Sequence, residues 1–204
     1  MICIIDYELG NTVSVQNAVR KLGYDCKISR DENMISNSDA IILPGVGSFE
    51  KGTNNLKKYN LVNILNNEVI IKKKKILGIC LGFQLMCNKG EEFGTNKGLS
   101  WLNLNVTKIK SKNFRLPHVG WNKLKIYRND INFFKGISDK DMFYFNHTYC
   151  IQKKNISDFI TLAECEYGEN FIAALKMNNI YGIQPHPEKS QNQGLQVLKN
   201  FFEN

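Results

Sequence analysis

The chain has 204 residues, of which 43% are hydrophobic and 23% charged, a balance typical of one globular domain and not of a disordered chain. Its 27 Lys and Arg exceed its 19 Asp and Glu, but the basic residues are scattered and form no nucleic-acid-binding motif. We therefore predict a single domain over residues 1–204, with no nucleic-acid partner.

The chain opens on a short apolar segment, residues 1–5, that ends at Asp6 and has no basic leader. This segment is predicted to form a buried strand and not an export signal. No segment approaches the roughly 20 apolar residues that a membrane-spanning helix requires. The six cysteines lack the spacing of a disulfide framework or a zinc site. These features predict a cytoplasmic protein with reduced thiols and with no metal, cofactor or membrane partner.

Strands and helices alternate through the first part of the chain. The predicted elements are a helix over residues 12–22 that ends at Gly23, a strand over 39–43, a helical region from 56 to about 73, a strand over 76–79, and a helix that begins at Leu81. Such an alternation predicts a parallel sheet that is covered by helices on both faces.

The pattern changes to short strands between about residues 102 and 183. The clearest of them cover residues 143–145, 159–162, 171–175 and 180–183, and a last helix is expected over 194–202. We therefore predict a three-layer α/β fold, with a mostly parallel sheet and an antiparallel extension.

The segment Gly78-Ile79-Cys80-Leu81-Gly82 joins a predicted buried strand to a predicted helix. A glycine two residues before and after the cysteine suits a nucleophile elbow, the sharp strand-to-helix turn that exposes a nucleophile at the edge of a sheet. Free N–H groups at the start of the helix, notably that of Leu81, can stabilise an oxyanion. Alone, the pattern fits a core cysteine between two packing glycines equally well.

A second segment, Pro185-His186-Pro187-Glu188, follows the predicted strand 180–183. Two prolines fix the backbone on both sides of the histidine, so we expect an extended segment in which His186 and Glu188 project to the same side. The carboxylate can then orient the imidazole as in a catalytic triad. Cys80 is thus predicted to be the nucleophile, His186 the acid and base, and Glu188 the residue that orients the histidine.

A third segment, Pro44-Gly45-Val46-Gly47-Ser48, follows the predicted strand 39–43. Glycine-rich backbone can turn its N–H groups toward a developing negative oxygen, although the segment alone also fits an ordinary turn. All three segments follow strands, and open α/β sheets place their sites at the carboxyl ends of strands. Because all three segments are expected at the same edge of the sheet, we interpret them as parts of one catalytic site.

At these residues the chain resembles the class I glutamine amidotransferases and, within them, the glutaminase subunits of imidazole glycerol phosphate synthase. The resemblance implies a flavodoxin-like sheet and a glutaminase that passes ammonia to a (β/α)8-barrel cyclase, which makes imidazole glycerol phosphate and AICAR in histidine biosynthesis. The matching segments are Asp6-Tyr7 with Gly10-Asn11, Leu43-Pro44-Gly45-Val46-Gly47, Gly78-Ile79-Cys80-Leu81-Gly82-Phe83-Gln84, Pro117-His118-Val119-Gly120-Trp121-Asn122 and His186-Pro187-Glu188-Lys189-Ser190.

The same resemblance assigns further roles. Val46 is expected to complete the oxyanion hole with Leu81, and His147 to lie near the glutamine pocket. His118 and Trp121 are expected to be structural or interfacial. The residues that would bind glutamine are Gly47, Gln84, Glu92, Thr148 and Tyr149, and those that would face the cyclase are Asn11, Tyr144 and Lys189.

The sequence departs from the family pattern at three places. Glu8 and Gln191 stand where glycine is usual, and Pro185 replaces a bulky aromatic residue. These departures leave the acceptor of the ammonia open, because related proteins supply an amidino group to surface-sugar precursors. Further alternatives are a standalone cysteine peptidase-like hydrolase and a non-catalytic binding subunit, which the predicted triad and glutamine ligands disfavour.

Overall fold

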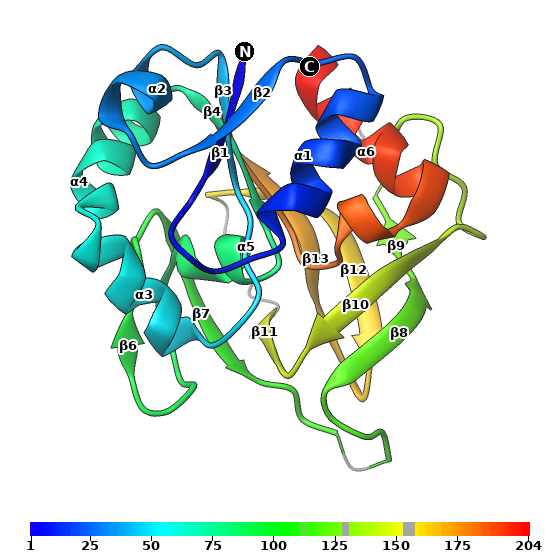
Figure 1. The fold of residues 1–204 in the computed structure, drawn as a ribbon. Coiled ribbons are helices and arrows are strands. Elements are labelled where there is room, and N and C mark those ends of the chain that lie inside the picture. Colours follow the sequence, from blue (N-terminus) through cyan, green and yellow to red (C-terminus); the bar gives the residue numbers. More distant parts are fainter. Residues whose placement is uncertain (112, 128–130, 153–157) are drawn as a thin grey trace.

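In the computed structural model, which describes residues 1–111, 113–127, 131–152 and 158–204, one mixed sheet runs through the molecule (Figure 1). Within the described residues it has 12 strands, in the order β2-β1-β3-β4-β14-β13-β11-β7-β5-β6, with β12 paired to β13 and β9 paired to β12. A separate two-stranded sheet pairs β10 with β8. The predicted fold class is therefore confirmed.

One half of this sheet is parallel. Its strands are β1 (Ile2–Ile5), β2 (Cys26–Ser29), β3 (Ala40–Leu43), β4 (Lys75–Ile79) and β14 (Ile180–Ile183). The four residues of β1, β3 and β14 are all buried, as expected for strands that helices cover on both faces. The parallel half brings the ends of β3, β4 and β14 to one edge, where the three candidate segments begin.

Helices cover this half of the sheet on both sides. Figure 1 shows α2 (Glu32–Ser36), α3 (Phe49–Lys58) and α4 (Leu61–Leu65) on one face, and α1 (Thr12–Lys21) and α6 (Gln191–Glu203) on the other. Two apolar clusters correspond to these faces. One contains Val15, Val19 and Phe201, and the other contains Leu56, Leu61 and Leu65.

The predicted helical region over residues 56–73 was wrong in its bounds. The first helix begins at Phe49, because the Ser48 hydroxyl accepts a hydrogen bond from the Lys51 N–H and caps it. Asn60, at a φ of 55°, then breaks the segment between α3 and α4. A π-helix over Asn66–Ile71 completes it. The short β2 and α2 were not predicted.

The rest of the chain forms a mostly antiparallel extension, in which β5 and β7 pair in parallel. It contains β5 (Cys87–Gly90), β6 (Asn96–Lys97), β7 (Leu102–Lys108), β9 (Lys125–Ile126), β11 (Tyr149–Gln152), β12 (Ile160–Tyr167) and β13 (Glu169–Met177). The separate sheet is formed by β8 (His118–Lys123) and β10 (Met142–His147), and a short 3-10 helix, η2, covers Asn132–Phe134. These strands place the segment around His147 beside the edge that carries the candidate site.

Two further observations concern the whole chain. All six cysteines are free and buried. Among the residues that the structure describes, no helix combines the length and apolar character needed to cross a membrane.

Candidate active site

Cys80 lies at a sharp turn between β4 and the short helix α5 (Leu81–Leu85). Its backbone has a φ of 51° and a ψ of −110°, outside the regions that L-residues ordinarily populate. Gly82 is required two residues later, because a Cβ atom there would lie 1.8 Å from the Leu43 carbonyl oxygen. The Cys80 N–H donates to the Ile183 carbonyl at 2.8 Å and ties the turn to β14. The predicted elbow is therefore present.

The turn after β3 packs directly against this elbow. A Cβ atom on Gly45 would lie 2.6 Å from the Gly82 backbone nitrogen, so the two segments approach too closely for any other residue. The Tyr7 hydroxyl donates to the Pro44 carbonyl at 2.6 Å and holds the turn in place. Gly47 has a φ of +125°, which favours glycine.

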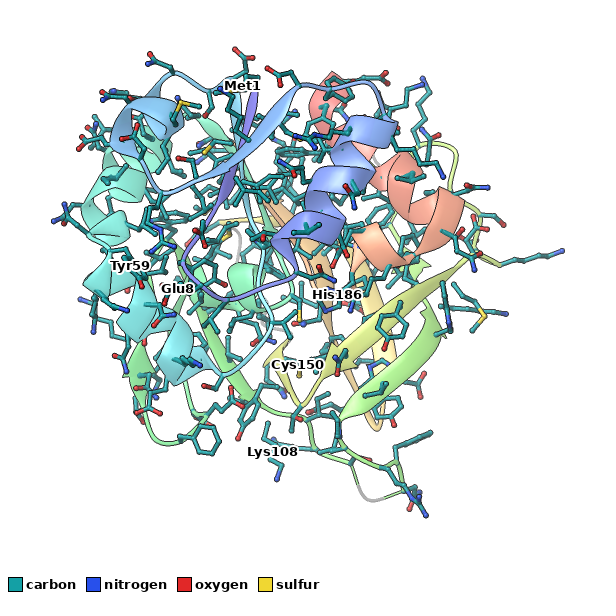
Figure 2. The ribbon with its side chains drawn as sticks, in the orientation of Figure 1. Met1, Glu8, Tyr59, Lys108, Cys150 and His186 are labelled. Atoms are coloured by element: carbon teal, nitrogen blue, oxygen red, sulfur yellow. The ribbon has the colours of Figure 1, made fainter. Side chains whose placement is uncertain are left out.

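His186 and Glu188 form the predicted pair. His186 Nδ1 lies 2.8 Å from Glu188 Oε1, and both side chains are buried. The His186 N–H donates to the Tyr144 carbonyl at 2.8 Å, and the Ser190 hydroxyl donates to the His186 carbonyl at 2.6 Å. Figure 2 shows His186 below α1, between that helix and the sheet of β8 and β10. Glu188 thus holds the imidazole, and bonds to Tyr144 and Ser190 hold the backbone of His186.

The backbone of this pair differs from the prediction in one respect. His186 is extended, at a φ of −96° and a ψ of 95°, but Pro187–Lys189 forms a 3-10 turn, η3. The expectation of an extended segment through Glu188 was wrong, because proline suits the first position of a helical turn. This turn brings Glu188 back toward the imidazole.

The surroundings of His186 favour its protonated form. Burial alone would lower the pKa of the imidazole, but the adjacent Cys80 sulfur and the Glu188 carboxylate outweigh burial and raise this pKa to about 10. The second ring nitrogen, Nε2, is buried and makes no hydrogen bond of ordinary geometry within the described residues. Cys80 is the neighbour that raises the pKa of His186 most, as expected of a nucleophile and its base before substrate binds.

Cys80 opens into a cavity of about 240 Å³. The predicted oxyanion residues Val46 and Leu81 line this cavity, as do all five predicted glutamine ligands: Gly47, Gln84, Glu92, Thr148 and Tyr149. Leu81 is the first residue of α5, so its N–H has no partner within the helix. Pro117, Asn146 and His147 complete the lining.

Two of these side chains are already engaged by the protein. Gln84 Nε2 donates to the Tyr149 carbonyl at 2.8 Å and to Gln184 Oε1 at 3.0 Å, which uses both amide protons and leaves Gln84 only its carbonyl oxygen to offer. Glu92 Oε2 accepts the Phe49 N–H at 2.8 Å and is thereby held at the cavity.

A buried pair of neutral histidines supports the wall of the cavity. His147 Nδ1 lies 2.8 Å from the Tyr149 carbonyl, which can only accept, so Nδ1 carries the proton. His147 Nε2 must then accept from His118 Nδ1 at 3.2 Å. Burial lowers the pKa of His118 to about 4 and that of His147 to about 3. His147 thus lies at the pocket, as predicted, and His118 behind it.

The residues predicted to face a partner fall into two groups. Tyr144 lies beside His186, with ring centroids 6.4 Å apart, and the Lys189 ammonium lies 5.6 Å from the Tyr144 ring. Trp121, which is 41% exposed, contacts Tyr144 on the next strand. Asn11 lies instead at the start of α1, where its side chain accepts the Ser14 N–H and caps the helix.

Sequence reasoning missed one polar side chain at the centre of the site. Gln184 is fully buried, and its Nε2 donates to Cys80 Sγ at 3.5 Å while its Oε1 accepts from Gln84. A polar residue directly after an apolar strand, two positions before the candidate base, was the available signal.

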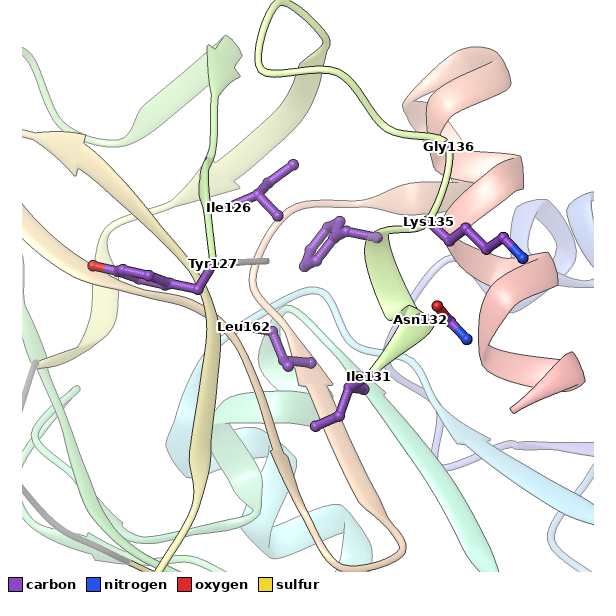
Figure 3. A pocket seen from close by; sticks show the side chains of 8 residues that line it. Ile126, Tyr127, Ile131, Asn132, Lys135, Gly136 and Leu162 are labelled. Atoms are coloured by element: carbon purple, nitrogen blue, oxygen red, sulfur yellow. The ribbon is translucent and has the colours of Figure 1, made fainter. Parts of the chain in front are cut away.

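Other cavities lie apart from this one. The cavity in Figure 3, of about 250 Å³, is lined mainly by apolar side chains such as Ile126, Ile131, Phe134 and Leu162. In this view the Lys135 ammonium points away from them. None of the lining residues belongs to the predicted site.

The glutamine amidotransferase class-I family model matches residues 3–204. The chain is also 43% identical to the imidazole glycerol phosphate synthase subunit HisH 2 of Methanococcus maripaludis, with 99% of this chain and 98% of the relative covered. It is 41% identical to the HisH 1 subunit of Campylobacter jejuni, with 98% of each chain covered.

Solved structures match the fold at lower identity. PurLQS from Thermotoga maritima has a TM-score of 0.75 at 19% identity, over 99% of this chain and 97% of that one. A glutamine amidotransferase from the same organism has a TM-score of 0.61 at 18% identity, over 99% of this chain and 83% of that one. These likenesses support the fold described above.

Proposed function

This chain belongs to the class-I glutamine amidotransferase family, and on that premise we propose that it is the glutaminase subunit of imidazole glycerol phosphate synthase. It hydrolyses glutamine to glutamate and ammonia within a complex with a cyclase subunit. The pathway is histidine biosynthesis, in which the cyclase makes imidazole glycerol phosphate and AICAR. Relatives that are about 40% identical over nearly the whole chain are named as HisH subunits of imidazole glycerol phosphate synthase.

One observation carries the chemistry. Cys80, at a strained turn, shares its cavity with the glutamine-ligand candidates Gln84 and Glu92, and the buried pair of His186 and Glu188 lies on its other side. This arrangement supports roles for Cys80 as nucleophile, for His186 as proton carrier and for the cavity as substrate pocket. The cavity of about 240 Å³ is small, which suits an amino acid better than a peptide.

In the first half of the proposed reaction, the Cys80 thiolate attacks the side-chain amide carbon of glutamine. The negative oxygen that forms is stabilised by the backbone N–H groups of Leu81 and Val46. His186 donates its proton to the leaving nitrogen, so ammonia departs and a glutamyl thioester remains. The raised pKa of His186, about 10, keeps that proton available at neutral pH.

In the second half, His186 takes a proton from water, which attacks the thioester and releases glutamate. Glu188 keeps the imidazole in the orientation with Nδ1 protonated and stabilises its positive charge. Gln84 accepts a hydrogen bond from the substrate through its carbonyl oxygen, and the free carboxylate oxygen of Glu92 pairs with the substrate ammonium group. No metal or cofactor is assigned a role.

Ammonia must reach the cyclase before water protonates it, so we further propose a closed path across a contact with a (β/α)8-barrel subunit. Tyr144 and Lys189 flank His186, and Asn11 lies on a helix that contacts η3. We place these three residues at that contact. We also propose that the domain spans residues 1–204 and that the complex works in the cytoplasm.

The pathway is tested by asking which acceptor stimulates glutamate release. The chain is purified with the histidine-pathway cyclase of the same organism and, separately, with a surface-sugar synthase that needs an amidino nitrogen. We expect stimulation only in the first complex, and only when its acceptor substrate is present. Stimulation in the second complex alone would contradict the proposed pathway and leave the glutaminase chemistry intact.

A further inference from the structure

The side chain of Gln184 is a fully buried polar group between the proposed nucleophile and the proposed substrate ligand. It follows β14, and its own backbone N–H donates to the Ala173 carbonyl at 2.7 Å, which fixes its place in the sheet. A buried amide without partners is costly, so its contacts are specified by the fold. Those contacts are Gln84 on one side and Cys80 on the other.

The orientation of this amide follows from its neighbours. The Tyr149 carbonyl can only accept, so the atom of Gln84 that lies 2.8 Å from it is the nitrogen. The same nitrogen lies 3.0 Å from the Gln184 side chain, which must therefore present its oxygen there. The Gln184 nitrogen is left to face the sulfur of Cys80, at 3.5 Å.

The far end of this chain of bonds is also directional. His147 Nδ1 donates to the same Tyr149 carbonyl at 2.8 Å, and His118 donates to His147. Gln84 and His147 thus both donate to one carbonyl, so the Tyr149 peptide cannot turn away without breaking two buried hydrogen bonds. The position of Gln84, and through it that of Gln184, is therefore held by hydrogen bonds that run through the cavity wall to His118.

We propose that Gln184 is a positioning residue of the glutaminase reaction, which holds the Cys80 sulfur with its N–H and the glutamine ligand Gln84 with its carbonyl oxygen. The inference rests on the proposed function, because it assigns Cys80 and Gln84 their roles. An N–H that faces the sulfur stabilises its negative form before attack. The same amide keeps both protons of Gln84 committed to the protein, so that its oxygen faces the substrate.

Two variants separate the two bonds. Gln184→Met keeps the unbranched length and removes both. Gln184→Glu keeps an oxygen toward Gln84 and replaces the N–H toward Cys80 by a carboxyl oxygen. Gln152→Met is a matched control, because Gln152 also donates to a cysteine sulfur, that of Cys150 at 3.9 Å, but does not line the cavity.

The first measurement is the pH profile of Cys80 alkylation by iodoacetamide, with the modified peptide identified by mass spectrometry in the complex with the cyclase. We expect both Gln184 variants to shift the profile to higher pH and Gln152→Met to leave it unchanged. A side chain that only fills space would lower the melting temperature without moving this profile. Superimposable profiles for folded Gln184→Glu and wild type would overturn the inference.

The second measurement is steady-state glutamate release by the same complexes. We expect kcat to fall about 10- to 100-fold in both variants, the loss typical of a hydrogen bond to a charged group. KM for glutamine should rise in Gln184→Met and change little in Gln184→Glu. If both variants keep the wild-type kcat, the role of Gln184 is overturned but the proposed function is not. If the wild-type complex releases no glutamate, the proposed function itself is overturned.

Discussion

The three histidines of the chain have surroundings that set opposite protonation states. His118 and His147 are buried, and burial lowers their pKa values to about 4 and about 3. Burial would lower the pKa of His186 too, but Cys80 and Glu188 raise it to about 10. In the proposed reaction, one histidine therefore carries the proton, while the other two stay neutral and form the hydrogen bonds that lead to the Tyr149 carbonyl.

We predict that no histidine titrates between pH 5 and 8, although an unperturbed histidine has a pKa of about 6.5. The measurement is an NMR titration of the ring protons in the folded chain. A histidine that titrates near pH 6.5, assigned to position 118 or 147, would contradict the neutral pair. One assigned to position 186 would contradict its pairing with Cys80 and Glu188.

The neutral pair also predicts acid sensitivity. Because the folded pKa values of His118 and His147 lie below those of the unfolded chain, the folded chain binds fewer protons below about pH 6.5, and its stability falls as the pH drops. His186 has the opposite sign, since its contribution is complete below about pH 6.5 and is lost as the pH rises through about 10. In urea unfolding, the free energy of unfolding should fall less between pH 7 and pH 5 for His118→Gln than for wild type.

At the triad, Glu188→Gln should lower the single-turnover rate less than His186→Ala. The carboxylate orients and stabilises the imidazole, whereas the imidazole itself transfers the proton, and the two losses should differ by a factor on the order of ten to one hundred. Equal losses, or a larger loss in Glu188→Gln, would show that the roles have been assigned wrongly.

Among the elements, the turns around the sheet edge contain several residues with an unusual backbone. Gly45 packs on the elbow so closely that a bulky substitution there would displace Gly82 and disturb Cys80 itself. Gly47 differs, since an added Cβ would meet only Leu9, at 3.5 Å, although the φ of +125° is unfavourable for any side chain. Gly47 is therefore the better position at which to test whether this turn presents the Val46 N–H.

We predict that Gly47→Ala reduces acceptor-stimulated glutaminase activity by at least about tenfold, because a shifted turn withdraws one oxyanion donor. Gly94→Ala is the matched control, since Gly94 has a φ of +99° with open space around it and lies outside the cavity. Both substitutions should lower the melting temperature by a similar amount. If Gly47→Ala leaves the rate unchanged, this turn does not contribute an oxyanion donor to the reaction.

Two departures from the family pattern have a backbone explanation. Glu8 has a φ of 63° and Gln191 a φ of 52°, the left-handed region where glycine carries no steric cost. The steric cost at Glu8 is offset by contacts of its carboxylate with Arg30 and Lys58, each at 3.6 Å. Figure 2 shows Glu8 beside Tyr59. The third departure, Pro185, has no explanation in the structure.

Gln191→Gly should accordingly raise the free energy of unfolding by about 1 kcal/mol. Asn192→Gly, one residue further into α6 and outside the left-handed region, should lower it by up to about 1 kcal/mol. Equilibrium denaturation of both variants measures whether their free energies of unfolding change in these opposite directions. A loss of stability in Gln191→Gly would mean that its side chain contributes more than the strained backbone costs.

Over the whole molecule, the parallel half apart from β2 was predictable from sequence, as was its site edge, because buried strands followed by glycine-rich turns are local patterns. The pairing of β8 with β10 was not, since antiparallel strands separated by a long connection leave no local signal. That pairing places His118 opposite His147 and carries the chain into Thr148 and Tyr149. The Gln184 contacts likewise depend on tertiary packing, as does the 3-10 turn that brings Glu188 to His186.

In the proposed reaction, Cys80 attacks glutamine in a complex that uses the ammonia elsewhere. The most direct measurement compares wild-type and Cys80→Ala complexes with the cyclase, loaded with its acceptor, for glutamate release from glutamine and for product formation from added ammonium. We predict that Cys80→Ala loses glutamate release by a factor on the order of a thousand or more and keeps ammonium-dependent synthesis, because the cyclase and its contact are intact. Glutamate release within a few-fold of wild type would contradict the account.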